Sequence, residues 1–175
     1  MKNHNNGWIN RLVMVGAALL ASSSFAADRL DTYYERAGLN WRAYDKVLLD
    51  PLSISNAKVV PPPWVEGKDR NPRQWALTAE DVAFAKQAYR TAMKQQLEKD
   101  GGYTIVSEPG EGVLELAIAI VSLTPYALPD EKVVTKGSGE LTMQVELRDA
   151  LSRDLLAIYE GDQPVGEESQ ENTAL

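Results

Sequence analysis

The chain has 175 residues, no cysteine, and a formal net charge of −7 from 18 basic and 25 acidic residues. This acidic balance, without a basic stripe anywhere along the chain, argues against nucleic acids and anionic membrane surfaces as partners. The lack of cysteine excludes disulfides, thiolate metal sites and cysteine nucleophiles, and the length suits one domain.

The N-terminus has the pattern of a secretory signal peptide. Residues 1–11 are polar and weakly basic, residues 12–20 are apolar, and small residues lead to Ala26. The apolar run is about half of the ~20 residues that a membrane-spanning helix needs. We therefore expect residues 1–26 to be cleaved near Ala26, a periplasmic or secreted location, and no stable membrane insertion of the mature chain. An uncleaved membrane anchor is the alternative.

The chemistry open to the mature chain is narrow. The single histidine, His4, lies within the expected signal peptide. Without imidazole or thiol, Ser–His–Asp and Cys–His hydrolases and the usual zinc, copper and haem sites are excluded. We expect no cofactor and no metal. The acidic stretches at residues 149–154 and 162–171 offer oxygen ligands for calcium, but neither has the spacing of a known calcium loop, which favours solvated turns.

Residues 27–160 form the expected single domain. Its first part, residues 27–41, is expected to be a lead-in with one or two helical turns. Residues 46–54 are rich in branched apolar side chains and predict a strand, in which Pro51 indicates an edge position or a bulge. Residues 59–72 contain three consecutive prolines and predict a stiff surface loop.

A long helix is expected from Thr78 to the glycine pair at positions 101 and 102. Thr78 supplies a capping hydroxyl, and the acids after it complement the helix dipole; Asp81 stands where a capping box usually has Glu or Gln. Apolar side chains then recur at helical spacing: Val82, Ala85, Tyr89, Ala92, Met93 and Leu97. This face is expected to pack on the core.

Four strands are expected after the helix, at residues 103–107, 113–123, 139–148 and 155–159, with a hairpin turn at 149–154. The element order predicts an α+β fold, a mostly antiparallel sheet of about five strands with one long helix packed on one face. The first strand and the one after the helix should cross over right-handed if they are parallel neighbours. Residues 161–175 are expected to be a disordered, polar and acidic tail.

Several short motifs carry a resemblance to a known family. Leu30-Asp31-x-Tyr33, residues 44–51, the helix start at residues 77–81, residues 103–106 with 109–110, and residues 113–116 resemble a bacterial family of small envelope proteins, DUF3313-like, whose function is unknown. Many of its members are lipoproteins. The resemblance covers residues 30–159 and implies an envelope location and a fold type, but it supplies no catalytic residues.

Two features differ from the pattern that this resemblance implies. Lipoprotein relatives carry an acylated cysteine, whereas this chain has Ala26-Ala27 at the expected cleavage point, which favours release into the periplasm. The family also tends to end in an amphipathic, Trp-containing helix, whereas residues 161–175 are polar here. We expect a shortened family member in which part of the sheet or helix is left uncovered.

The preferred functional hypothesis is a non-enzymatic module that binds another envelope protein. Its candidate binding residues are the aromatic side chains before the helix, Tyr33, Tyr34, Trp41, Trp64 and Trp75. Aromatic side chains are enriched in binding patches because they bury a large area at low entropic cost. Taken singly, each of them is more often a packed core residue.

Two other functions remain open at this point. The first is a carboxylate-only hydrolase of cell-wall or polysaccharide material, for which Asp45, Asp50, Glu115 and Glu146 are the strand-borne acids. Acids on strand faces are usually solvated, so no residue is assigned as catalytic. The second is a truncated, inactive family member.

Overall fold

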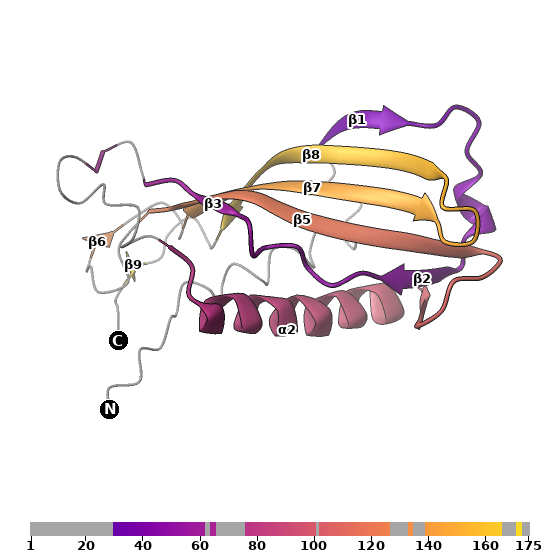
Figure 1. The fold of residues 1–175 in the computed structure, drawn as a ribbon, viewed down its shortest axis with the longest axis horizontal. Coiled ribbons are helices and arrows are strands. Elements are labelled where there is room, and N and C mark those ends of the chain that lie inside the picture. The colour runs from indigo at the N-terminus through magenta and orange to yellow at the C-terminus, as the bar shows by residue number, and fades with distance from the viewer. Residues whose placement is uncertain are drawn as a thin grey trace.

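The computed structural model describes residues 30–61, 64–65, 76–100, 102–126, 133–134, 139–165 and 171–172 (Figure 1). These residues form an α+β fold, as expected. The elements in chain order are β1 (Asp31–Glu35), the 3-10 helix η2 (Trp41–Ala43), β2 (Lys46–Leu49), β3 (Lys58–Val59), α2 (Ala79–Gln95), the π helix η5 (Gln96–Asp100), β4 (Thr104–Val106), β5 (Val113–Pro125), β6 (Val133–Val134), β7 (Gly139–Asp149), β8 (Leu155–Val165) and β9 (Glu171–Asn172).

The main sheet has seven strands and is mixed, so the expectation of about five mostly antiparallel strands was wrong. Its order is β1-β8-β7-β5-β2-β4, and β3 also pairs with β5. The pairs β1–β8, β8–β7 and β7–β5 are antiparallel, whereas β2 is parallel to both β5 and β4. The parallel half arises because α2 carries the chain from β2 back to β4, and residues 107–112 then return it to the start of β5.

Pro51 produces a bulge rather than an edge strand. Leu49 pairs with Leu116, and Ser53 pairs with Ala119. The segment around Pro51 therefore advances by four residues where β5 advances by three. Backbone N–H groups on either side of Pro51 donate to β5 carbonyls at 3.0 Å. Proline has no N–H to donate, and the extra residue allows the chain to pass it and rejoin the sheet.

A complete capping box starts α2. The Asp81 N–H donates to Thr78 Oγ1 at 3.1 Å, and the Thr78 N–H donates to Asp81 Oδ2 at 2.8 Å. Aspartate therefore performs the role that Glu or Gln usually has in this motif. The helical path continues through η5 and ends at the glycine pair, where Gly102 has φ of 68° and the Tyr103 N–H donates to the Leu97 carbonyl at 2.9 Å.

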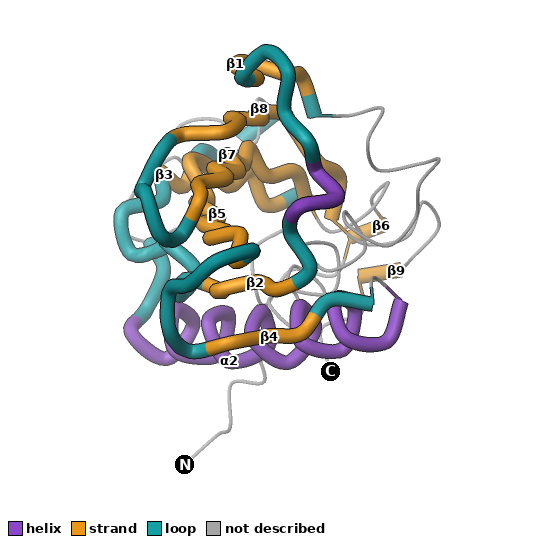
Figure 2. The backbone as a smooth tube through the Cα atoms, turned by 90° about the vertical axis from the view of Figure 1, so that its right-hand side faces the viewer, coloured by secondary structure: helices purple, strands orange, loops and turns teal. Residues whose placement is uncertain are grey.

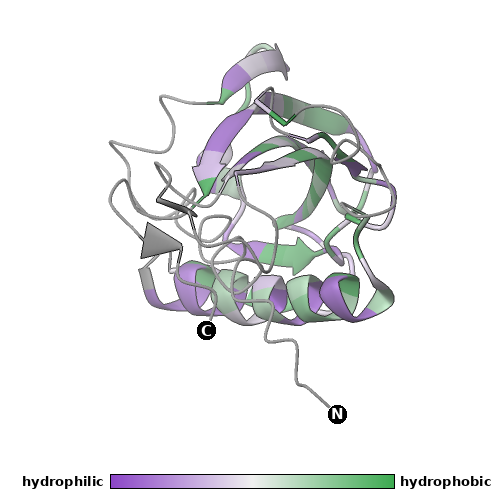
Figure 3. Cartoon of the chain, turned by 90° about the vertical axis from the view of Figure 1, so that its left-hand side faces the viewer, coloured by the Kyte–Doolittle hydropathy of each residue, from purple (hydrophilic) through white to green (hydrophobic). Residues whose placement is uncertain are grey.

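The expected apolar face of α2 is buried against the sheet. Ala85, Tyr89, Met93 and Leu97 are at most 4% exposed and share one core with side chains of β2, β5 and β7. Figure 3 shows many apolar residues along the strands above α2, and polar and apolar residues interspersed along the helix. No helix in the described ranges is both long and apolar enough to cross a membrane.

The alternation of apolar and polar residues expected in the C-terminal strands is confirmed, but the last of these strands ends later than expected. The inward-facing residues of β5 and β7 are buried, Leu116 at 2% and Met143 at 1% exposure among them. β8 continues to Val165, which is fully buried, beside Gln163 at 2% exposure. Residues 161–165 thus belong to the sheet rather than to the expected tail, because they pair with β7 and bury the side chains of Gln163 and Val165.

The N-terminal lead-in is mostly extended. Residues 31–35 form β1, with all five side chains exposed, and the helical content is limited to the three residues of η2. Figure 2 shows the sheet curling from β4, which lies along α2, to β1 on the far side. Of the one or two helical turns expected here, η2 supplies one, and β1 is extended because pairing with β8 satisfies part of its backbone.

Candidate functional site

Four of the five predicted aromatic residues are described by the structure, and they lie at three places in the fold. Tyr33 and Tyr34 lie on β1, where they are 78% and 39% exposed. Trp41 begins η2 and lines an internal cavity. Trp64 is 59% exposed and stacks at a tilt of 59° on the ring of Tyr126, with ring centroids 5.4 Å apart. Trp75 lies outside the described residues.

β1 presents an open sheet edge. Among the described strands it pairs only with β8. Thr32 faces Tyr159 and Tyr34 faces Ile158, so Tyr33 is the extra residue of a bulge. A bulge at a sheet edge redirects a side chain away from the regular alternation. This explains why Tyr33 is largely exposed although it lies within a paired strand.

An apolar cavity of about 480 Å³ lies between the C-terminal end of α2 and the concave face of the sheet. Its lining residues come from many segments of the chain: Leu30, Thr32, Trp41, Val47, Gln96, Leu97, Tyr103, Leu114, Leu116, Ile118, Val145, Leu147 and Tyr159. None of them is charged. The volume falls within the range of ~300–1,000 Å³ that is typical of small-molecule sites.

The polar groups of this cavity are few. The Tyr159 hydroxyl donates to Glu35 at 3.3 Å at the exposed end, where burial and the nearby Glu35 carboxylate raise the pKa of Tyr159. The side-chain carbonyl oxygen of Gln96 is buried and has no hydrogen-bond partner among the described residues. Gln96 is also the first residue of the π helix η5. A buried, unpartnered acceptor at a π turn is unusual, because native proteins pair most buried polar atoms.

The four predicted strand-borne acids are not among the residues that line the apolar cavity. Glu115 is 5% exposed and is paired with Arg153, while Glu146 is paired with Arg148. Glu115 lies opposite Arg148 in the register of β5 and β7, so Glu115, Arg148 and Glu146 project from the same face of the sheet. Each of these two carboxylates is therefore engaged by an arginine.

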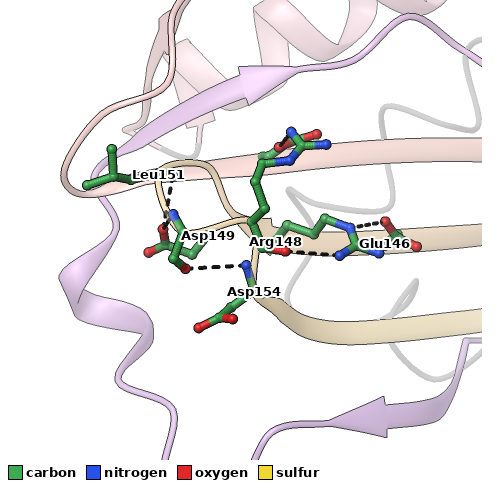
Figure 4. A network of polar contacts seen from close by, with 8 residues as sticks. Glu146, Arg148, Asp149, Leu151 and Asp154 are labelled. Atoms are coloured by element: carbon green, nitrogen blue, oxygen red, sulfur yellow. Dashed lines mark hydrogen bonds and ion pairs between the residues drawn. The ribbon is translucent and has the colours of Figure 1, made fainter.

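The acidic hairpin at residues 149–154 is organised by its own hydrogen bonds (Figure 4). Asp149 Oδ1 accepts from the N–H groups of Leu151 and Ser152, at 3.0 and 2.8 Å, and Asp149 Oδ2 accepts from the Tyr44 hydroxyl at 3.0 Å. These bonds, the Ser152 N–H first, lower the pKa of Asp149. Asp154 is paired with Arg36 at 3.2 Å. Both carboxylates are thus engaged by partners in and beside the turn.

Comparisons with known proteins give a family and two distant likenesses. The chain is similar to a PelC dodecamer variant from Paraburkholderia phytofirmans, with 13% identity, a TM-score of 0.38, and coverage of 81% of this chain and 83% of that chain. It is also similar to the LpoB C-terminal domain from Salmonella enterica, with 11% identity, a TM-score of 0.29, and coverage of 93% and 99%. No curated protein matches. A family model matches residues 16–174, and the chain therefore belongs to the family described as protein of unknown function, DUF3313.

Proposed function

We propose that this protein is a non-enzymatic binding module of the bacterial cell envelope, which docks an extended segment of another envelope protein along β1. The observation that carries the proposal is the open edge of β1 with the bulged, 78% exposed Tyr33 at its centre. An edge strand offers a row of unpaired N–H and C=O groups that an extended segment can pair with as an added strand.

The side chains of β1 indicate the chemistry of the partner. Asp31 and Glu35 stand at the two ends of the strand, and Tyr33 and Tyr34 lie between them. Carboxylates at both ends favour a segment with basic residues, and the acidic net charge of the whole chain supports the same choice. The phenol rings would supply most of the buried area.

The periplasmic location is part of the proposal and rests on the N-terminal pattern that ends at Ala26. The direct measurement is the intact mass of the protein recovered from the periplasmic fraction. We expect a mature chain that begins at Ala27. A chain that retains residues 1–26 in the cytoplasmic fraction would contradict the location.

Site-specific photo-cross-linking in cells tests the binding role. A photoreactive phenylalanine replaces Tyr33, and matched replacements at Trp64 and at Phe84, which is 38% exposed on α2, provide the comparison. We expect one reproducible envelope protein cross-linked from position 33 and none from position 84. A partner captured only from position 64 would move the interface to the Trp64–Tyr126 pair. No partner from any position, with folded protein present, would refute the binding role.

A further inference from the structure

We infer that β1 is an exchangeable strand, which leaves β8 of its own chain and pairs with β8 of a second copy to form a strand-exchanged dimer. The surface concerned is the edge of β8 that β1 covers, and its occupant is the same segment, Asp31–Glu35, of the other chain. The inference is independent of partner docking along the outer edge of β1, because that edge is the same in both forms. Its failure would leave the docking proposal intact, and the reverse also holds.

Few side-chain contacts hold β1 in place. All five of its side chains are exposed, so the strand contributes little of the apolar burial that stabilises a fold. Leu30, directly before the strand, packs partly buried against the core. The ion pair of Arg36 with Asp154 lies at the surface, where such pairs contribute little to stability. The backbone pairing with β8 is therefore the main attachment of β1.

Two features of this pairing weaken it. Asp31 lies directly opposite Glu160, and like charges at opposed positions destabilise a strand pair. The bulge at Tyr33 interrupts the ladder in the middle of the strand, so the regular pairing is short on either side. By contrast, β7 pairs with β8 without a break along residues 139–147. Opening β1 therefore costs less free energy than opening the inner strand pair.

The edge of β8 is already complementary to one sequence, that of β1. The Tyr159 hydroxyl donates to Glu35 at 3.3 Å, and the Arg36 N–H donates to the Leu156 carbonyl at 2.8 Å. The β1 strand of a second copy makes the same contacts, so the exchanged form regains what opening loses. Among the described strands β1 pairs only with β8, so it leaves without breaking another strand pair. The free energy of exchange then depends mainly on the cost of association and on the hinge.

The hinge between β1 and η2 contains a residue in a left-handed backbone conformation. It consists of residues 36–40, and Gly38 within it has φ of 76°, a value that favours glycine. A Cβ at this position would meet no atom within 4 Å, so a side chain here adds backbone strain without a steric clash. Strain in a hinge loop favours exchange, because an extended hinge in the dimer relieves it. Gly38→Ala should therefore destabilise the closed monomer relative to the dimer.

The first test compares Gly38→Ala with the wild type and with Gly102→Ala. Gly102 has φ of 68° and equally open surroundings, but it lies after η5, outside the hinge. Each protein is refolded from urea over a range of concentrations, and its dimerisation constant is measured by analytical ultracentrifugation. We expect Gly38→Ala to raise this constant by about tenfold or more, and Gly102→Ala to leave it within about twofold of the wild type. No increase in folded Gly38→Ala would overturn the inference.

Engineered disulfides then determine whether the dimer is strand-exchanged. The chain has no cysteine, so the double variant Asp31→Cys/Glu160→Cys carries thiols only at two positions that face each other in the β1–β8 register. Opposed residues of an antiparallel pair are close enough for a disulfide. The bond lies within one chain in the closed monomer and joins two chains in the exchanged dimer. The matched control, Gln144→Cys/Glu160→Cys, joins β7 to β8 and stays within one chain in both forms.

Monomer and dimer fractions of each double variant are oxidised separately and compared on a non-reducing gel. We expect Asp31→Cys/Glu160→Cys to give covalently joined chains from the dimer fraction and single chains from the monomer fraction. A dimer fraction that separates into single chains, as the control should, would overturn the inference, since the copies then associate through another surface. Absence of a dimer from both the wild type and Gly38→Ala, with folding established by circular dichroism, would overturn it as well.

Discussion

Glu115 and Arg153 show how one residue pair fixes the tip of the β7–β8 hairpin. Arg153 has φ of 66°, a left-handed conformation that costs free energy for any residue with a Cβ. Its guanidinium is paired with Glu115, which is 5% exposed. The ion pair offsets the backbone strain because it neutralises a carboxylate that is nearly buried.

Removing the arginine should therefore destabilise the fold. Arg153→Ala keeps the backbone strain but leaves the Glu115 carboxylate unpaired, and we expect a loss of about 1–2 kcal/mol, kept small because Arg153 itself is well exposed to water. Urea unfolding of Arg153→Ala, Glu115→Gln and the double variant measures it. The double variant should lose less than the sum of the two single losses; strict additivity would show that the pair is not coupled.

Asp149 should make stability depend on pH in the acid range. Its folded pKa is lowered, so its contribution is fully present above the unfolded value of about 3.9 and is lost as the pH falls through the folded pKa. Asp149→Asn keeps an acceptor for the turn but carries no charge. The difference in unfolding free energy between wild type and this variant should be constant from pH 7 to 5 and shrink below pH 4. A difference that grows towards low pH would contradict the assignment.

The sequence identified candidate binding residues by type, but it did not indicate which of them lie together in the fold. Trp41 was a candidate for binding and does line the cavity, but it was grouped with Tyr33 and Trp64, which do not. Nothing in the sequence distinguished Gln96, because a glutamine is a common helix residue and the start of the π helix at this position has no sequence pattern of its own. Glu115 was expected to be solvated, and only the hairpin brings Arg153 over it.

The start of α2 is the element for which local sequence was most informative. Thr78→Ala removes the hydroxyl that accepts from the Asp81 N–H, and we expect a loss of about 1 kcal/mol. Thr91→Ala is the matched control, since Thr91 is exposed within the same helix and only bonds back to the Gln87 carbonyl. It should change stability by less than about 0.5 kcal/mol. Equal effects of the two substitutions in thermal unfolding would show that the cap is not important.

The β5–β7 pair depends on close backbone approach at the end where Pro125 faces Gly139. A Cβ at Gly139 would lie 2.7 Å from the Thr124 carbonyl oxygen, whereas a Cβ at Gly110 would lie 3.8 Å from a Val113 methyl carbon. Gly139→Ala should therefore cost about 1–3 kcal/mol, while Gly110→Ala should be neutral within about 0.5 kcal/mol. Denaturant unfolding compares them, and a neutral Gly139→Ala would mean that the strand ends separate easily.

Elements whose apolar residues recur with a regular spacing were predictable from the sequence, and short or exposed elements were not. The alternation in β5 and β7 and the helical spacing in α2 survive in the structure because each has one buried face. β1 has no buried face, so its sequence does not alternate between apolar and polar residues. Its pairing with β8 also depends on residues more than 120 positions away. The bulge at Pro51 was foreseen as one of two alternatives, and only the register decides between them.

At the scale of the whole molecule, strand direction was the main error. The sequence between β2 and β4 contains the helix, but it does not indicate which strand pairs with the edge of β2 opposite β4. Parallel pairing with β5 depends on residues 107–112 returning the chain to the level at which β4 began. This curled, mixed sheet creates the concave face, so the cavity is a property of the topology and could not be derived from residue spacing.

The N-terminal strand β1 is an outer strand of this sheet, so its loss should affect the whole fold. The proposed cleavage after Ala26 would leave residues 27–30 before β1. A chain that starts at residue 37 would lose β1, the bond from the Arg36 N–H to the Leu156 carbonyl at 2.8 Å, and the Arg36–Asp154 ion pair. We expect this truncated chain to unfold at a lower urea concentration than the chain starting at residue 27, and to expose β8 as a new sheet edge that promotes self-association. Equal urea midpoints, with both chains monomeric by size-exclusion chromatography, would mean that β1 is a dispensable appendage and that the sheet is complete at β8.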